Sequence, residues 1–400
     1  MKNTLRFLLL LFVLLLAACS NTPIATETIS VSEPIIRTIQ ISTPTQPQEE
    51  SAASEELSPV YPVEETQPMP SPVPQLIEAV VQNLQTPWEI VFLPDGRMMI
   101  TERPGTLTII DADGTRIPIA DVYERGESGL LGLVLHPDFI ENQFLYLYLT
   151  YQTSSGMFNR IERYRFSDNK LTESTIILDN IPGASNHDGG RMEFGPDGLL
   201  YITTGDAENA NQSQDTNSLA GKILRLRDDG GIPEDNPFGN PIYSYGHRNP
   251  QGLAWDSQNR LWATEHGPSG LGSGYDELNL IEIGGNYGWP LIQGDQTREG
   301  LITPQLQSGG NETWAPGDLE IVDDVAFFVG LRGATLYSVP LNAIIPENLQ
   351  RHFVGEFGRL RALRLGPDGF LYMGSSNTDG RATPKAGDDK IFRVDWHQLR

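Results

Sequence analysis

The sequence predicts an all-β domain, because one short pattern recurs along most of the chain. The pattern is an apolar residue, a turn of the Pro-Asp-Gly type and a run of β-forming residues. It occurs at residues 92–96 before MMITER, at 194–198 before LLYITTGD and at 365–369 before FLYMGSS, with variants at 136–138 and 255–256. Helical periodicity is almost absent from the same part of the chain.

The spacing of these turns predicts how the sheets are arranged. The turns begin near residues 94, 137, 196, 256 and 367, about forty to sixty residues apart except for a last gap about twice as long. A degenerate unit near residues 310–340 would fill that gap and bring the number to six. Six sheets of about fifty residues each predict a six-bladed β-propeller. A pair of β-sandwiches is the alternative, but sandwiches rarely repeat one turn at this interval.

A propeller also needs its ring to be closed. Residues 391–394 read IFRV, a short β-forming run at the end of the chain. We expect this run to pair with a strand near the start of the domain, either at residues 76–81 or at residues 106–110.

The first nineteen residues are a targeting segment and do not belong to the fold. Lys2 and Arg6 precede an apolar run at residues 7–16 that is too short for a resident membrane helix. Residues 16–19 read LAAC and resemble the lipobox of bacterial lipoproteins, in which the cysteine is acylated. We therefore expect residues 1–19 to be a lipoprotein signal peptide. Cys19 would anchor the protein to a membrane through its lipid, and the protein would lie outside the cytoplasm, at the cell surface or in the periplasm. An ordinary signal peptide with an incidental cysteine is the alternative.

Residues 20–78 differ in composition from the segments on both sides. They are rich in Pro, Ser, Thr and Glu, and they bury too little apolar surface to offset the entropy of ordering. We expect a disordered linker that holds the propeller, residues 79–400, away from the membrane. The whole chain has a net charge of −24 and shows no basic stripe, which argues against a nucleic-acid partner. Because cations are scarce, places where arginines gather are informative.

Polar loops follow or precede many of the expected strands. The richest stretch is residues 244–290, which contains GHRNP, EHGP, DELNL and NYGWP. In a propeller, the loops at one end of the central channel converge, so that one polar loop from each blade can build a shared site. The other candidate loops are residues 127–132, 186–191, 204–206, 331–333 and 359–361. Neither a paired histidine spacing for zinc nor a glycine-rich nucleotide loop occurs in the sequence.

These loops carry a resemblance to a known family. The signatures GESGLLGLVLHPDF, NHDGGRMEFGPDG, TTGDA, GHRNPQGLAW, EHGP, DELNLIEIGGNYGWP and RLRALRLGPDG occur in this order. They resemble the soluble, pyrroloquinoline quinone (PQQ)-dependent aldose dehydrogenases of the glucose/sorbosone dehydrogenase family, which are six-bladed propellers. The resemblance implies an oxidoreductase that oxidises the anomeric hydroxyl of aldose sugars to lactones. Hydride would pass to PQQ with the help of calcium, and electrons would then pass to an acceptor that the sequence does not identify.

The resemblance assigns roles to three catalytic candidates. His187 matches the family's catalytic histidine, and an imidazole that titrates near neutrality suits removal of the hydroxyl proton. Asp206 matches the carboxylate that orients this ring. Arg248 matches the arginine that stabilises negative charge developing on the reduced quinone. Without the resemblance, His187 and Asp206 would be interpreted as turn residues and Arg248 as a solvated charge.

PQQ carries three carboxylates, so that its site needs several forked donors. The cofactor-binding candidates implied by the resemblance are Glu127, Arg248, Asn249, Arg332, Arg359 and Arg361. Many relatives have glutamine at the position of Glu127, and a carboxylate there must be protonated or must accept a hydrogen bond from the cofactor. Residues 314–328 look short and acidic beside the family's fifth blade, which bears on the assignment of Arg332.

Calcium is the second cofactor that the resemblance implies. Hard cations prefer oxygen ligands, including backbone carbonyls, and one ion would polarise the cofactor's carbonyl as a Lewis acid. The candidate metal ligands are Gly267, Pro268, Asp276, Glu277 and the carbonyl of Tyr287. Without the resemblance, Asp276 and Glu277 would be interpreted as a solvated turn.

Two other functions stay open from the sequence alone. A calcium-dependent lactonase or other hydrolase on a similar propeller would use His187 to activate water, and it would not need Arg248, Arg359 and Arg361 together. A propeller that has lost its chemistry would serve as a binding module, although the retention of His187, Asp206, Arg248 and Asn249 argues against this. Dye reduction that depends on added PQQ distinguishes a sugar dehydrogenase from a lactonase and from a binding module.

Overall fold

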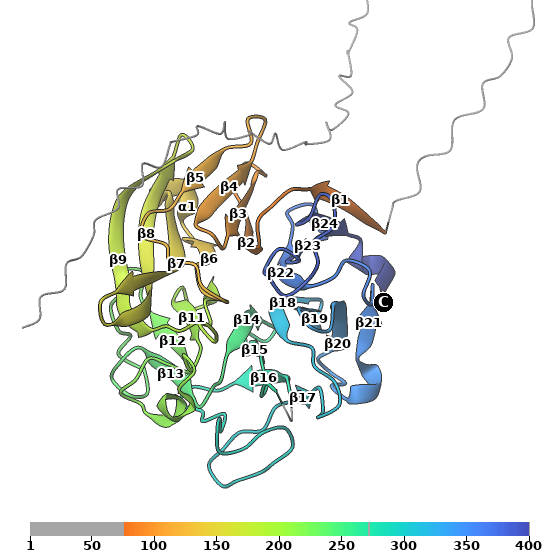
Figure 1. The fold of residues 1–400 in the computed structure, drawn as a ribbon. Coiled ribbons are helices and arrows are strands. Elements are labelled where there is room, and N and C mark those ends of the chain that lie inside the picture. The colour runs from red at the N-terminus through yellow and green to blue at the C-terminus, as the bar shows by residue number, and fades with distance from the viewer. Residues whose placement is uncertain (1–75, 271–272, 400) are drawn as a thin grey trace, which may run out of the picture.

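The computed structural model describes residues 76–270 and 273–399, and these residues form six four-stranded antiparallel sheets around a central axis (Figure 1). The predicted six-bladed β-propeller is confirmed. The predicted signal peptide with Cys19, and residues 20–75 of the predicted linker, lie outside the described residues. In the described ranges no helix is long and apolar enough to cross a bilayer.

The first three blades follow one another along the chain, and each uses its strands in sequence order from the centre outward. The first contains β2 (Pro87–Phe92), β3 (Met98–Glu102), β4 (Thr106–Ile110) and β5 (Arg116–Pro118). The second contains β6 (Leu130–Leu135), β7 (Phe144–Thr153), β8 (Gly156–Ser167) and β9 (Lys170–Pro182). The third contains β10 (Met192–Phe194), β11 (Leu200–Thr204), β12 (Lys222–Leu226) and β13 (Ile242–Tyr245).

The remaining three blades complete the ring. The fourth contains β14 (Pro250–Trp255), β15 (Leu261–Glu265), β16 (Glu277–Ile281) and β17 (Leu306–Gln307). The fifth contains β18 (Pro316–Val322), β19 (Val325–Gly330), β20 (Thr335–Pro340) and β21 (Gln350–His352). The sixth contains β22 (Leu360–Leu365), β23 (Leu371–Ser375), β24 (Ile391–Val394) and β1 (Ile77–Val81). Short helices α1 (Phe139–Asn142), η1 (Ala210–Gln214), η2 (Pro346–Asn348) and η3 (Trp396–Leu399) lie between or after strands.

The ring closes through the first of the two pairings expected from the sequence. Strand β1 pairs antiparallel with β24, with Ile77 opposite Val394 and Ala79 opposite Phe392. Residues 106–110 instead form β4, which pairs with β3 and β5 inside its own blade. The degenerate unit expected near residues 310–340 is the fifth blade, which has all four strands although residues 314–328 looked short.

The two ends of the channel, its mouths, carry different loops. The first strand of every blade lies innermost (Figure 1). Because neighbouring strands are antiparallel and a connection joins each blade's outer strand to the next inner strand, two kinds of loop share one mouth. These are the loops that precede an inner strand and the loops between second and third strands. The recurring Pro-Asp-Gly turns join first to second strands, and they therefore lie at the opposite mouth.

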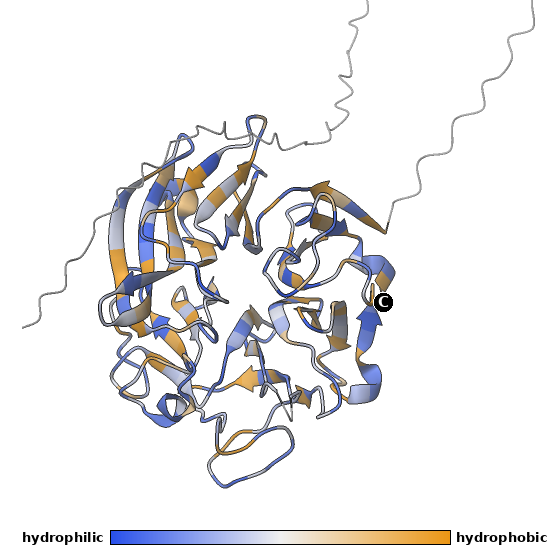
Figure 2. Ribbon diagram, viewed as in Figure 1, coloured by the Kyte–Doolittle hydropathy of each residue, from blue (hydrophilic) through white to orange (hydrophobic). Residues whose placement is uncertain are grey.

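Apolar side chains between neighbouring sheets form the core. One cluster joins Leu131 and Tyr148 of the second blade to Ile202 and Leu224 of the third, and all four are buried. Figure 2 shows apolar and hydrophilic positions interspersed along the strands, while many loop segments are hydrophilic. Each large apolar side chain that is fully buried contributes about 1.5–3 kcal/mol of transfer free energy. This packing holds the blades at fixed angles and therefore fixes where their loops meet.

A buried arginine ties the inner strands together in the channel. The Arg191 guanidinium is fully buried, pairs with Glu89 of β2 and lies 3.1 Å from Asp318 of β18. It also donates to the carbonyls of Gln251 (2.9 Å) and Gly317 (3.1 Å). Four blades are thus joined by one side chain whose charge is neutralised where water is excluded. This ionic cluster supports the loops above it.

Candidate active site

The predicted site residues come from loops that share one mouth of the channel. Four of the loops directly precede inner strands, and they carry Glu127, His187, Arg248 and Arg359. Three others lie between second and third strands, and they carry Asp206, Gly267 and Arg332. The fold therefore brings together residues that are up to about 230 positions apart in the sequence.

His187 and Asp206 form a hydrogen-bonded pair. The His187 Nδ1 atom lies 2.7 Å from Asp206 Oδ1, and their side chains are 17% and 3% exposed. On the other side of the ring, His187 Nε2 lies 2.8 Å from Arg248 Nη2. A guanidinium can only donate hydrogen bonds. Nε2 therefore presents its lone pair, and Nδ1 carries the proton that is donated to Asp206, which is the tautomer that a general base at Nε2 requires.

Arg248 is held from several sides. Its backbone N–H donates to Glu265, and its Nη2 donates to Ser269 Oγ at 2.8 Å. Burial lowers the pKa of the Arg248 guanidinium, while nearby carboxylates, Asp206 first among them, oppose that effect. In the arrangement seen here, Arg248 covers the lone pair of His187. A substrate hydroxyl can reach Nε2 only after this one hydrogen bond is exchanged.

Trp289 supports the same pair and was not identified from the sequence. Its indole Nε1–H donates to Asp206 Oδ2 at 2.9 Å, and the Arg248 guanidinium lies 5.5 Å from its ring centroid. Asp206 therefore has one oxygen fixed by Trp289 and the other directed at His187. Trp289 belongs to the NYGWP motif, so the sequence marked this segment as informative. The sequence did not reveal the contact between Trp289 and Asp206.

A cavity of about 210 Å³ lies beside this pair. Glu127, whose carboxylate accepts the His187 backbone N–H at 3.1 Å, lines it together with Ser269. The residues that line the cavity are Glu127, His266, Gly267, Pro268, Ser269, Asp276, Thr313, Ala315, Leu331, Arg332, Arg359 and Arg381. Of the predicted cofactor-binding residues, Glu127, Arg332 and Arg359 are among them.

Three arginines give the cavity wall its charge. Arg332 is exposed, and among the described residues no side chain pairs with its guanidinium. Arg359 is anchored by Asp379 at 2.7 Å and donates to the Leu331 carbonyl at 3.2 Å. Arg381 is the third, and it was missed because its loop, residues 376–390, carries none of the motifs on which the resemblance rests. A ligand with several carboxylates suits such a wall.

His266 adds a neutral group to the same wall. Burial, with Arg248 and Arg361 nearby, lowers the pKa of His266 to about 3 although Glu127 opposes this. Its Nε2 lies 2.9 Å from the Pro316 carbonyl and must carry the proton. At neutral pH, His266 is therefore an uncharged imidazole whose other nitrogen is an acceptor.

The state of Glu127 differs from both alternatives considered from the sequence. Burial raises the pKa of Glu127, but His266, Arg381 and the His187 N–H together lower it to about 2. The side chain is thus ionised, and its oxygens are engaged by Arg381 and by the His187 backbone. It is neither protonated nor dependent on a ligand for a partner.

Arg361 and Asn249 lie deeper than the cavity wall. Arg361 Nη1 donates to Gln251 Oε1 at 2.7 Å, and burial lowers the pKa of Arg361 to about 9. Asn249 Oδ1 accepts the Gly189 N–H at 3.0 Å. In the described part of the chain, Arg361 Nε and Asn249 Nδ2 are buried donors without a partner. Unpaired donors and arginines next to the His187–Asp206 pair fit an anionic cofactor with carbonyl acceptors.

The predicted calcium ligands are divided by the structure. Gly267, Pro268 and Asp276 line the cavity, and Gly267 N–H donates to Asp276 Oδ1 at 2.9 Å. Glu277 and Tyr287 do not line it. Among the described residues, no group of three or more His, Cys, Asp or Glu side chains is placed to hold a metal ion. A cation here would therefore depend on backbone carbonyls and the cofactor's own oxygens.

The remaining polar residues of the 244–290 stretch support the fold. His247 is fully buried between Glu265 (2.8 Å) and Ser244 (2.9 Å), and its ring stacks on Tyr287 with centroids 4.6 Å apart. Glu277 is opposite Glu265 in the β15–β16 pair. Burial first, and then Glu265, raise the pKa of Glu277 to about 8.

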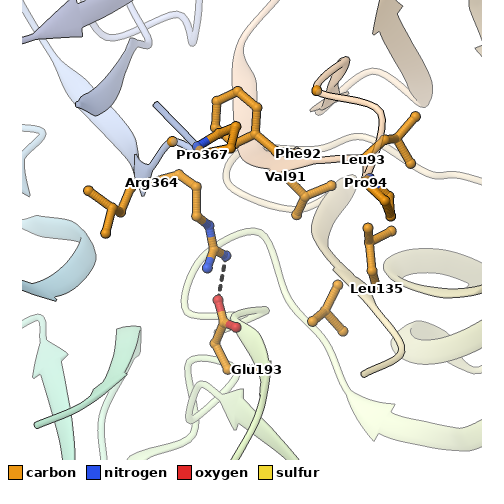
Figure 3. Close-up of a pocket in the computed structure, with 12 residues that line it drawn as sticks. Val91, Phe92, Leu93, Pro94, Leu135, Glu193, Arg364 and Pro367 are labelled. Carbon is orange, nitrogen blue, oxygen red and sulfur yellow. Dashed lines mark hydrogen bonds and ion pairs between the residues drawn. The ribbon is translucent and has the colours of Figure 1, made fainter. Parts of the chain in front are cut away.

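A larger cavity, of about 530 Å³, lies at the opposite mouth (Figure 3). Phe92, Leu135 and Leu365, at the ends of inner strands, line it, and Arg364 pairs with Glu193 at its floor. None of the predicted site residues contributes to it. This cavity lies at the mouth that carries the Pro-Asp-Gly turns, whereas the His187–Asp206 pair lies at the other mouth.

The fold and the site together define a class of protein: a six-bladed propeller with a hydrogen-bonded histidine–aspartate pair beside a cavity lined by arginines. The sequence profile of the glucose/sorbosone dehydrogenase family matches residues 84–384. The chain belongs to this family.

Individual relatives support the same placement. The aldose sugar dehydrogenase YliI of Escherichia coli is 34% identical over 342 residues, which cover 76% of this chain and 91% of that protein. Quinoprotein glucose dehydrogenase B of Acinetobacter calcoaceticus is 32% identical over 274 residues, 59% of this chain and 56% of that protein. The PQQ-bound aldose sugar dehydrogenase structure from Streptomyces coelicolor is 37% identical and has a TM-score of 0.73, with 79% of this chain and 97% of that chain covered.

Proposed function

We propose that the protein oxidises the anomeric hydroxyl of aldose sugars to the lactone, with PQQ as hydride acceptor and with calcium assisting. The observation that carries the proposal is the His187–Asp206 pair, with the lone pair of Nε2 directed at Arg248 beside a cavity lined by three arginines. Membership of the glucose/sorbosone dehydrogenase family supports the reaction class. Relatives named as aldose sugar dehydrogenases support the substrate class.

The residues divide the work between binding and proton transfer. Arg332 and Arg359 would hold the carboxylates of the cofactor, while Asn249 and Arg361 would offer their unpaired donors. The bound quinone supplies the acceptor for the hydride that leaves the anomeric carbon. His187 would take the hydroxyl proton at Nε2, and Asp206 would stabilise the resulting imidazolium through Nδ1. Arg248, displaced from Nε2, would be free to donate to developing negative charge.

The proposed calcium site lies on the same cavity wall. Gly267, Pro268 and Asp276 lie together on the cavity wall, and two of them would contribute backbone oxygens. Asp276 already accepts the backbone N–H groups of Trp314 (2.7 Å) and Ala315 (3.1 Å). Glu277 and Tyr287 do not line the cavity and are not part of the proposed site.

Reconstitution tests the function. The purified protein would be mixed with PQQ and calcium, and reduction of a dye would be followed with several aldoses while the product is analysed for lactone. We expect reduction that requires both the sugar and the quinone and that falls when calcium is chelated. No quinone-dependent reduction with any aldose would refute the proposal, and sugar-independent lactone hydrolysis would favour a lactonase instead.

The lipid anchor at Cys19 is proposed from the sequence. Mass spectrometry of protein purified from membranes should show an acylated Cys19 at the mature N-terminus, and Cys19→Ser should release the protein from the membrane fraction. Membrane association that persists in Cys19→Ser would contradict the anchor.

A further inference from the structure

The loop between β23 and β24 crosses the mouth to the loops of other blades. From this loop, Arg381 reaches the connection before β6 and the connection before β10. Its Nη1 pairs with Glu127 Oε1, and its Nη2 donates to Asn186 Oδ1 at 2.7 Å. The base of the loop is fixed by Asp379, which accepts the Arg381 N–H at 2.8 Å and pairs with Arg359.

Glu127 links Arg381 to His187, because its carboxylate contacts both residues. One of its oxygens meets Arg381, and the other accepts the backbone N–H of His187 at 3.1 Å. The backbone of His187 has a φ of 65°, a conformation that non-glycine residues seldom adopt without outside support. Asn186, the residue before it, is held by Arg381 directly. Two of the contacts that hold this unusual backbone therefore depend on one guanidinium.

The position of the pair explains why a carboxylate occupies site 127. The Glu127 side chain is 14% exposed and Arg381 is 44% exposed, so that the ion pair lies at the edge of the cavity. A glutamine at this position could accept the His187 N–H but would bring no charge to fix Arg381. The function of Glu127 is thus tied to a residue 254 positions away in the sequence.

We propose that Arg381, acting through Glu127 and Asn186, is a positioning residue that sets the backbone of His187 and so aligns the base with its substrate. This inference rests on the proposed function for its effect on turnover, but the placement of His187 can be measured without cofactor. The geometry also assigns Glu127 to this task in place of a direct contact with the cofactor.

The first test uses the full chain without PQQ. Protein labelled with ¹⁵N-histidine contains six histidines, and the His187 amide signal can be assigned by its loss in His187→Gln. In Arg381→Gln, we expect hydrogen exchange at this amide to accelerate about 10-fold, the loss associated with one charge-assisted hydrogen bond. Arg97→Gln breaks a comparable arginine–aspartate pair at the opposite mouth, and it should leave the His187 amide unchanged.

The second test uses steady-state kinetics with PQQ. A shift of the base costs turnover more than binding, so that Arg381→Gln should lower kcat about 10-fold or more with little change in the KM for sugar. Glu127→Gln keeps the contact between Arg381 and Asn186 and should show a smaller loss than Arg381→Gln. The double variant should lose no more than Arg381→Gln, because the linkage through Glu127 is already broken in that variant. Arg381→Lys keeps a charge for Glu127 and should recover part of the turnover.

The outcomes are separable. Unchanged exchange at the His187 amide in Arg381→Gln would overturn the inference, as would additive losses in the double variant. Weaker PQQ binding in Arg381→Gln with normal exchange would make Arg381 a cofactor ligand instead of a positioning residue. If the wild-type protein oxidises no sugar, the proposed function fails, while the exchange experiment still decides whether Arg381 places His187.

Discussion

The ionised state of Glu127 should be measurable as pH-dependent stability. Its pKa is about 2 in the folded protein against an ordinary value of 4.5, and a shift of about 2.5 units corresponds to about 3 kcal/mol. Two effects reduce this figure near neutral pH. Arg381 is 44% exposed, so that solvent screens part of its attraction, and His266 becomes charged only below about pH 3. We therefore expect about 2 kcal/mol.

The direction follows from the sign of the shift. Because the folded pKa lies below the unfolded one, the stabilisation is complete above about pH 5 and is lost as the pH falls toward about 2. Glu127→Gln has no charge to lose. The difference in unfolding free energy between wild type and variant should therefore be about 2 kcal/mol larger at pH 7 than at the acid end of this range.

Urea unfolding at a series of pH values between 7 and 3 measures about 1 kcal/mol of this change, because the folded pKa lies below that range. Glu234→Gln, which removes an exposed carboxylate in a loop of the third blade, serves as the matched control and should show no such trend. If the difference between wild type and Glu127→Gln is the same at pH 7 and pH 3, Glu127 is not held in its ionised form and the reasoning fails.

Three further predictions follow from the site and the core. His187→Gln should lower kcat by about 10²–10⁴-fold while PQQ still titrates by absorbance, whereas His352→Gln, on the fifth blade, should keep full activity; equal losses in both would refute the assignment of the base. Arg191→Met leaves Asp318 buried without its paired cation, and leaves Glu89 with only Arg364 at 3.5 Å, and it should cost about 3–5 kcal/mol in urea unfolding; a cost below about 1 kcal/mol would show that these acids are already neutral. Glu277 has a pKa raised from 4.5 to about 8, so that its contribution is complete below about pH 4.5 and is lost as the pH rises to about 8; without calcium, Glu277→Gln should melt at a higher temperature than wild type at pH 9 and at a similar one at pH 4.

The sequence was sufficient for the architecture because the signal for a propeller is local. Each Pro-Asp-Gly turn specifies a tight reversal between two short strands, and its recurrence counts the blades. Even the fifth blade, whose turn is the degenerate Asp323-Asp324, was predictable from the gap that it fills. The same turns say little about function, since the structure places them at the mouth opposite His187.

The site was predictable only in part. The pairing of His187 with Asp206 and the grouping of Arg332, Arg359 and Glu127 at one cavity agree with the residues that the resemblance selected. The resemblance selected Arg361 and Asn249 as cofactor contacts, but neither lines the cavity. Glu277 and Tyr287 also lie outside the cavity. Trp289 and His266 were not assigned although both lie inside quoted motifs, and Arg381 was not assigned because its loop carries none of them.

What the sequence determined by itself is the number of blades and the set of polar loops available at one mouth, since both follow from turns and strands within about fifty residues of one another. What only the tertiary structure decided is which side chains from those loops meet. Arg381 and Glu127 come together because packing between sheets fixes the angle of each blade around the channel. Contacts across that channel join residues with no regular spacing along the chain, and for this reason no local pattern announces them.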